Sequence, residues 1–256
     1  MIRFLLLCIF ACTTCYARPS VKESLEQIPL HDRKKIERLF LYLVYNEPFG
    51  YTLFGDKPFS TTGWPKEFRW ELLFIGCYET CLKYDWSIWE KYKHLFPIKK
   101  FAFLAIEDPT YLEINLFNLA ECKKKISENL DLFQKKLKCS DSPDKILDYL
   151  KLCSDSLGVL GGSQALYGLL LGFGRNNSLY FEHFYTDKMY FLKPLNMFNP
   201  ETCISPFKMR LPDFASLDDE DTERLRKNYT EQRSRMIELY SQGDFLEITL
   251  CQLTSN

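Results

Sequence analysis

The sequence predicts an α+β fold that is mainly helical and contains a small antiparallel or mixed sheet. Two short apolar segments, residues 101–106 and 112–116, flank a Glu-Asp-Pro-Thr turn, and the second alternates between apolar and polar residues. Several longer segments instead repeat their apolar residues at helical spacing. Strands grouped in a hairpin, rather than alternating regularly with helices, favour this class over a doubly wound fold.

Helices dominate the part of the chain that precedes the hairpin. Ser20 is a suitable N-cap for a short helix that Pro29 ends, and residues 31–47 follow with apolar side chains at helical spacing. Residues 51–58 predict a short strand that runs into a turn. Residues 64–96 predict a further helix with one break.

The chain after the hairpin predicts three more helices and a last strand. One helix is expected over residues 119–137, and a second opens at Ser142-Pro143-Asp144. Residues 193–216 contain four prolines and predict a long connection. A long helix at 218–242 begins with four acidic residues, which the positive end of a helix favours. Its largely apolar stripe at 4-3-4-3 spacing must pack on another element: Leu225, Tyr229, Gln232, Met236 and Leu239. Alternation over residues 246–250 predicts a closing strand.

Residues 1–17 have the order of residues typical of a secretory signal peptide. Arg3 is followed by the apolar residues 4–11 and then by small and polar residues up to Ala17, where cleavage is expected. The apolar stretch is too short to span a bilayer, which needs roughly 20 residues. Residues 18–256 would then form a single exported domain.

The leader also permits a lipoprotein interpretation. Ile9-Phe10-Ala11-Cys12 approximates a lipoprotein signal, in which the thiol of Cys12 would carry the lipid. A retained leader is the third alternative. The three alternatives place the protein in the periplasm, in the envelope or outside the cell, with membrane association through the leader or Cys12.

Composition restricts the function classes. The net charge of −1 argues against a nucleic-acid surface, which requires a basic excess. Ten cysteines are present, and the seven beyond the leader are scattered, so buried thiols and disulfides are both possible. Cys77 and Cys81 would share a helix face, but no second Cys or His pair completes a metal site. No metal or other cofactor is expected.

Residues 157–174 contain no charged side chain and admit three interpretations. The segment could contact a membrane, or it could be a buried helix that packs closely through its glycines. It could also hold a nucleophile elbow at Ser163, with residues 157–160 as the preceding strand and His183 as the base. Because no Asp lies between Ser163 and His183, the buried helix is favoured.

Two polar loops are the candidate ligand-binding segments. Asp56 and Lys57 lie in the first, and Arg175 and Asn176 follow two glycines in the second. Glycine-rich loops let a backbone approach a ligand, and Arg175 with Asn176 could hold an anion. The alternative is a helix end followed by a new helix that begins at Asn177.

Three sequence elements carry a resemblance to a known group. They are FGYTLFGDKP at residues 49–58, WSIWEKYKHLFPIKKFAF at 86–103 and GLLLGFGRNNSLYF at 168–181. In this order the chain resembles uncharacterised exported proteins of Chlamydiae-type intracellular bacteria. The resemblance implies an envelope or secreted location and no catalytic residue. It also implies that the sequons at Asn176 and Asn228 are not glycan sites.

The sequence therefore favours an exported binding or interaction module at a bacterial envelope, rather than an enzyme. Its partner would be an unknown protein or small ligand. The alternatives are an exported serine hydrolase that uses Ser163 and a membrane-associated lipoprotein.

Overall fold

A computed structural model describes residues 19–65, 76–107, 111–152, 156–184, 193–194 and 209–255. The predicted leader, Cys12 and most of the predicted connection at 193–216 lie outside the described residues. Twelve α-helices are described: α1 (Val21–Glu26), α2 (Leu30–Leu41), α3 (Phe49–Phe54), α4 (Gly76–Tyr92), α5 (Leu119–Glu128), α6 (Leu130–Leu137), α7 (Pro143–Leu152), α8 (Ser156–Val159), α9 (Gln164–Leu170), α10 (Arg175–Phe184), α11 (Glu220–Ser241) and α12 (Phe245–Thr254). A π-helical turn, η1 (Tyr42–Asn46), and a 3-10 turn, η3 (Lys93–Leu95), extend α2 and α4.

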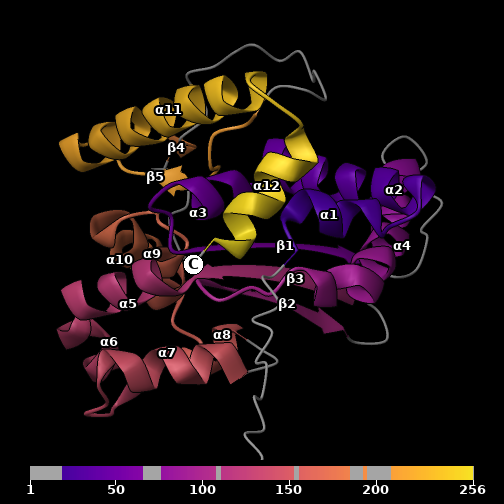
Figure 1. The fold of residues 1–256 in the computed structure, drawn as a ribbon. Coiled ribbons are helices and arrows are strands. Elements are labelled where there is room, and N and C mark those ends of the chain that lie inside the picture. The colour runs from indigo at the N-terminus through magenta and orange to yellow at the C-terminus, as the bar shows by residue number, and fades with distance from the viewer. Residues whose placement is uncertain are drawn as a thin grey trace, which may run out of the picture.

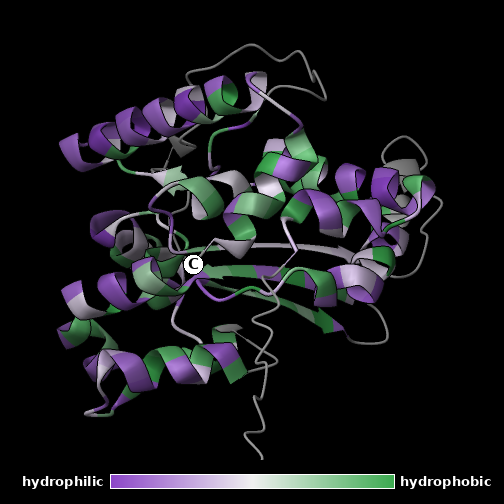
Figure 2. Cartoon of the chain, in the orientation of Figure 1, coloured by the Kyte–Doolittle hydropathy of each residue, from purple (hydrophilic) through white to green (hydrophobic). Residues whose placement is uncertain are grey.

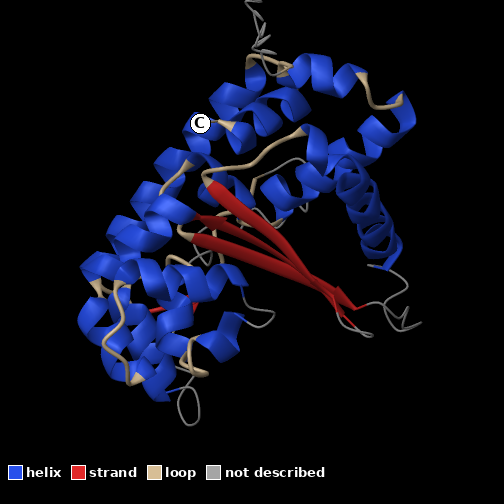
Figure 3. Ribbon diagram, turned by 60° about the horizontal axis from the view of Figure 1, so that its bottom comes forward, coloured by secondary structure: helices blue, strands red, loops and turns tan. Residues whose placement is uncertain are grey.

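The described strands confirm the α+β class. The strands β1 (Phe59–Pro65), β2 (Phe101–Glu107) and β3 (Tyr111–Asn118) form an antiparallel sheet in the order β1-β3-β2. They make one layer among the helices (Figure 3). A two-residue pair, β4 (Lys193–Pro194) with β5 (Ala215–Ser216), lies apart from this sheet.

Alternation along β3 sends its side chains into two different cores. Leu112, Ile114 and Leu116 belong to a first core that is built with α1, α2, α4 and α12. Phe117 points to the other face, where it stacks on Phe59 with ring centroids 4.3 Å apart and packs against α5, α6, α7 and α9. Figure 1 shows α1, α2 and α12 of the first group above the sheet and α6 and α7 of the second group below it.

A third core joins α11 to α3. Tyr229 and Met236 on the buried face of α11 pack with Tyr51 of α3 and Phe214, while the outer face of α11 is polar (Figure 2). The long predicted helix and its apolar stripe are thus confirmed. The Asp219 side chain caps α11 by accepting a hydrogen bond from the backbone N–H of Thr222 at 2.8 Å.

Several other predicted elements are confirmed. Ser20 and Glu23 form a reciprocal capping box at the start of α1. The hairpin at 101–116 is present as β2 and β3. The helix predicted at 119–137 is present but divides into α5 and α6 at Asn129.

The strand predicted at residues 51–58 is wrong, because residues 49–54 form helix α3. Phe49 and Leu53 face the first core, whereas Tyr51 faces the third. A short helix buried on several sides has a nearly continuous apolar sequence, which periodicity cannot distinguish from a strand. The helix predicted to start at residue 64 is wrong in its first two residues, since Trp64 and Pro65 close β1, and residues 66–75 lie outside the described residues.

The closing strand predicted at residues 246–250 is also wrong, because these residues lie in helix α12. The Asp244 side chain caps α12 by accepting from the backbone N–H of Glu247 at 2.8 Å. The buried positions Leu246, Thr249, Leu250 and Leu253 follow the i, i+3, i+4, i+7 spacing of a helix.

Within residues 157–174, helix α8 is followed by a turn at Gly161 and Gly162 and then by α9, which is buried against the second core. This arrangement agrees with the interpretation as a buried helix. A Cβ atom on Gly168 would lie 2.8 Å from the Ser178 Oγ of α10, so the glycine permits close helix packing. Among the described residues, no helix combines the length and apolar character needed to cross a membrane.

Candidate functional site

The structure brings together the two polar loops that the sequence singled out. The Asp56-Lys57 loop follows α3, and the glycine turn, residues 172–174, joins α9 to α10. Both loops lie beside α11. A hypothetical Cβ on Gly172 would be 3.3 Å from Cγ of Lys57 and 2.4 Å from the hydroxyl of Tyr229. The two segments are thus in direct contact although they lie far apart in the sequence.

A pocket of about 320 Å³ opens where α10 begins beside α11. Its lining residues come from the end of the glycine turn, the first turn of α10 and one face of α11. They are Gly174, Arg175, Asn176, Asn177, Asp221, Arg224, Leu225 and Asn228. Arg175 and Asn176, predicted as ligand-binding residues, therefore lie in the pocket wall.

The helix start at the pocket differs from the predicted one. α10 begins at Arg175 and not at Asn177, because Gly174 adopts the left-handed φ of +84° and its carbonyl accepts the first helical hydrogen bond, from the backbone N–H of Ser178. Gly174 has no side chain to cap the helix. Adding a Cβ there would bring it within 3.0 Å of Leu225.

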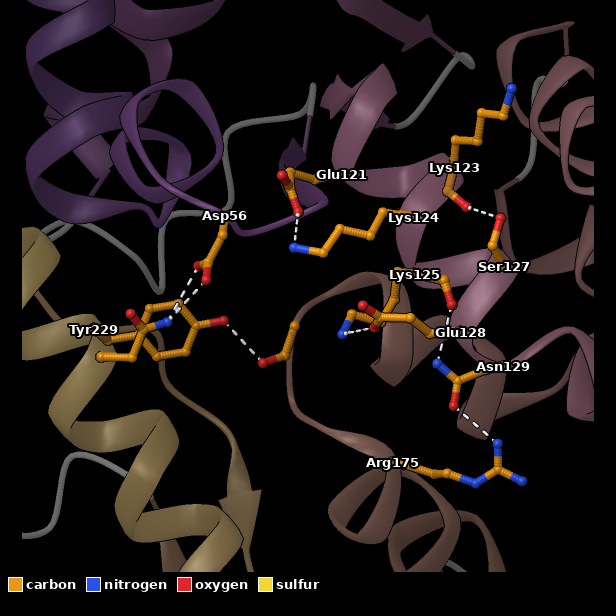
Figure 4. A network of polar contacts seen from close by, with 12 residues as sticks. Asp56, Glu121, Lys123, Lys124, Lys125, Ser127, Glu128, Asn129, Arg175 and Tyr229 are labelled. Carbon is orange, nitrogen blue, oxygen red and sulfur yellow. Dashed lines mark hydrogen bonds and ion pairs between the residues drawn. The ribbon is translucent and has the colours of Figure 1, made fainter.

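Two residues hold Arg175 in place: Asp131 in the first turn of α6, and Asn129, which directly precedes that helix. The guanidinium donates to Asn129 Oδ1 at 2.9 Å (Figure 4). It also donates to both carboxylate oxygens of Asp131, at 2.9 and 3.2 Å. Hydrogen bonding from Arg175 lowers the pKa of the Asp131 carboxyl. This bidentate pair fixes the orientation of the arginine at the pocket edge.

The asparagines of the pocket are also tied to neighbouring elements. Asn176 Nδ2 donates to Asp221 Oδ2 at 2.7 Å, and Asp221 pairs with Arg224 one turn later. Asn177 is buried, where its amide donates to the Phe173 carbonyl and its oxygen accepts from the backbone N–H of Leu217. These contacts hold the lining in one arrangement.

Asp56 does not line the pocket, but it forms hydrogen bonds with two side chains of α11. Its carboxylate accepts from Asn228 Nδ2 at 3.0 Å and from Gln232 Nε2 at 2.6 Å. Gln232 Oε1 is buried without a hydrogen-bond partner and lies 1.9 Å from where a Cβ on Gly55 would be. Asp56 therefore positions a lining residue and does not itself line the pocket.

Lys57 is 1% exposed and lies under the glycine turn. Its amine donates to the carbonyl of Phe59, and the neighbouring Pro58 carbonyl accepts from Cys122 Sγ at 3.1 Å. Burial lowers the pKa of Lys57 to about 7, with a smaller opposing effect from Cys122. Burial likewise raises the pKa of the Cys122 thiol.

Tyr229 connects α11 to the glycine turn. Its hydroxyl donates to the carbonyl of Gly172 at 2.8 Å (Figure 4), and its ring packs edge-on against Tyr51. Burial raises the pKa of Tyr229, so the phenol keeps its proton. The turn above Lys57 is therefore held by this hydrogen bond and by the stacking of Phe173 on Phe214.

Ser163 caps α9, and residues 157–160 do not form the strand that the nucleophile-elbow alternative requires. Residues 156–159 form helix α8, whereas a nucleophile elbow needs a strand before the serine. Ser163 Oγ accepts from the backbone N–H of Leu166 and donates to Glu182 Oε1 at 2.7 Å. All three histidines lie in the described part of the chain, and no histidine there forms a hydrogen bond with Ser163 Oγ. His183 is exposed on α10.

Glu182 takes part in a structural contact with Ser163. Although burial raises the pKa of this carboxyl, hydrogen bonds from Lys136 and Ser163 lower it overall. The ion pair between Lys136 and Glu182 also ties α6 to α10. Ser163 and His183 are thus on neighbouring elements, but the partner of the serine hydroxyl is the carboxylate of Glu182.

The described cysteines and acidic residues form no metal centre. Cys122, Cys139 and Cys251 are free thiols. Cys77 and Cys81 belong to α4, and nothing is described of their side chains. Within the described ranges, no group of three or more His, Cys, Asp or Glu side chains could hold a metal ion.

The α11 side of the pocket was not anticipated from the sequence. Asp221, Arg224, Leu225 and Asn228 follow i, i+3, i+4, i+7 spacing and so share a helix face. This face of α11 lies next to the apolar stripe of the same helix. It becomes a pocket wall only because α10 begins beside it, which the sequence alone does not show. Asn228 was noted in the sequence only as a sequon.

No protein-family model matches the chain, and no curated protein or solved structure matches it either.

Proposed function

We propose that this protein is an exported binding module whose pocket between α10 and α11 holds a small polar ligand. The observation that carries the proposal is the pocket itself, with about 320 Å³ of space and polar side chains fixed by their neighbours. This volume is at the lower end of the range for small-molecule sites. Side chains that are already ordered lose little conformational entropy when a ligand binds.

The chemistry of the lining supports binding rather than catalysis. It supplies amide groups from three asparagines, two guanidinium groups and one carboxylate. That carboxylate, Asp221, already accepts from Asn176 and Arg224. The lining residues include no Ser, Cys, His or Lys, which are the usual nucleophiles and proton carriers. A ligand with several hydroxyl, amide or carboxylate groups would match these donors.

A panel of amino acids, monosaccharides and nucleosides tests the proposal. Each compound is added to the ¹⁵N-labelled protein, residues 18–256, and backbone amide shifts are followed by NMR. We expect at least one compound to shift the amides of residues 174–177 and 221–228 in a saturable manner. If no compound acts there, or if the shifts lie elsewhere, the pocket is not the ligand site.

A pair of arginine variants provides a matched control. Arg224→Ala removes an exposed guanidinium from the pocket edge, and Arg235→Ala removes an exposed one from the same helix outside the lining. We expect Arg224→Ala to weaken binding of the active compound and Arg235→Ala to leave it unchanged. Equal weakening by both variants would show that the affinity reflects the general charge of α11.

The exported location rests on the leader sequence, with its Arg3 and apolar residues 4–11. Intact-mass analysis of the protein from fractionated native cells tests it. A soluble product that begins at residue 18 supports export as a free protein. A product acylated at Cys12 would make it a lipoprotein, whereas an uncut leader would contradict export.

A further inference from the structure

Lys57 is a buried cation-forming group without a counter-charge. Its amine donates to the Phe59 carbonyl. Among the described residues, no carboxylate forms an ion pair with it. A buried ammonium without a carboxylate is costly, so burial favours the neutral amine. The pKa of about 7 follows from this environment and places the charge change near neutral pH.

The titratable and charged groups around Lys57 do not offset its charge. Cys122 faces it from α5, Tyr229 covers the adjoining turn from α11, and Tyr51 lies in α3. Burial raises the pKa of the Cys122 thiol and of both phenols, so all three are neutral near pH 7. The nearest carboxylate in sequence, Asp56, accepts from α11 side chains instead.

The elements that cover Lys57 differ in how far they are exposed. Phe59 and Cys122 belong to the second core, where neither is exposed. In the glycine turn, residues 172–174, Gly172 is buried, whereas Phe173 and Gly174 are partly exposed. Two of its residues have positive φ values, +80° and +84°, and its Gly172 carbonyl is held by Tyr229. The turn is therefore the cover that can yield when the amine needs water.

The same turn ends in the pocket wall. Gly174 lines the pocket and directly precedes Arg175 and Asn176, the first residues of α10. A shift of the turn away from Lys57 would move the start of α10 relative to α11. The separation between these two helices sets the width of the pocket.

We propose that protonation of Lys57 displaces the glycine turn and so makes the pocket between α10 and α11 responsive to pH. This regulation rests on the proposed function, since it acts on the same pocket. In the neutral state the turn lies against the Lys57 side chain and the lining has the arrangement described above. In the protonated state the turn opens and gives the ammonium group access to water.

The experiment uses no ligand, so its outcome is independent of the ligand screen. Protein labelled with ¹³C at lysine Cε and with ¹⁵N on the backbone is titrated from acidic to alkaline pH by NMR. We expect the Lys57 signal to titrate near pH 7 and the amides of residues 172–176 to shift with the same midpoint. In Lys57→Met, the shift of these amides at that midpoint should be lost.

Lys124→Met is the matched control, because Lys124 is an exposed lysine on α5 that pairs with Glu121. In the Lys124→Met variant, the backbone amides of the glycine turn should shift with pH as they do in the unaltered protein. A Lys57 signal that titrates near 10, or a glycine turn that does not follow it, would overturn the proposal. So would loss of signal dispersion across the whole spectrum, which indicates global unfolding. Both readouts on the unaltered protein decide the matter even when Lys57→Met does not fold.

Discussion

Replacing Lys57 with methionine should change how the free energy of unfolding depends on pH. Methionine has a similar length and fills an apolar site without a charge. The folded-state pKa of Lys57 is lowered from 10.5 to about 7 by burial. Below about pH 7 both the folded and unfolded states carry the proton, whereas between about 7 and 10.5 the unfolded state alone carries it.

The sign of the effect follows from this difference in bound protons. The stability of the unaltered protein gains from rising pH, by up to about 1.36 kcal/mol for each pH unit in this window. The full interval corresponds to roughly 5 kcal/mol, and the part between about pH 6 and pH 9 to roughly 3 kcal/mol. Lys57→Met lacks this contribution. The variant should therefore be the more stable protein at acidic pH and lose that advantage as the pH rises.

Urea unfolding followed by tryptophan fluorescence at a series of pH values measures this quantity. The relevant number is the difference in unfolding free energy between the two proteins. Tyr51 and Tyr229, whose pKa values are raised by burial, titrate in both proteins and cancel in the difference. The lost hydrogen bond to Phe59 adds about 1 kcal/mol that does not vary with pH. A difference that stays constant from acidic to alkaline pH would refute the assignment of Lys57 as a neutral buried amine.

Three further substitutions test the packing that positions the site, each by urea unfolding. Tyr229→Phe should cost about 1–3 kcal/mol because it leaves the buried Gly172 carbonyl without its donor; an unchanged midpoint would mean that water replaces the phenol. Arg38→Met should lower the free energy of unfolding by about 3 kcal/mol, because the fully buried Asp85 carboxylate loses its two hydrogen bonds of 2.6 Å from Arg38. Adding Asp85→Leu to this variant should restore much of the lost stability. Phe133→Ala should cost about 3–5 kcal/mol, since the ring is fully buried in the second core; a cost below 1 kcal/mol would contradict that burial.

The sequence predicted those elements whose signals are local. The alternation of residues 112–116 identified β3, and the acidic start with its apolar stripe identified α11. It failed at α3, whose apolar sequence is nearly continuous, and at α12, where apolar and polar residues alternate. In α12 the cap at Asp244 was the local signal that could have corrected the prediction.

The site was predictable only in part. Arg175 and Asn176 were found because glycines precede them, and Asp56 and Lys57 because of their turn sequence. Their mutual proximity depends on the packing of α3, α9 and α11, which no local pattern encodes. The burial of Lys57 was likewise hidden, since an isolated lysine next to an aspartate in a turn is ordinarily solvated.

The packing of α12 against α1 and α2 determines when the first core can close. Leu250 and Leu253 share this core with Leu25, and Gln252 Nε2 donates to the Leu53 carbonyl, 199 residues earlier in the chain. During synthesis from the N-terminus, the apolar faces of α1 and α2 therefore lack this partner until α12 has left the ribosome. Such late closure delays folding, because contacts between distant segments form only after a large loop is closed. The apolar faces of α1 and α2 therefore stay exposed for most of the time that the chain takes to be synthesised.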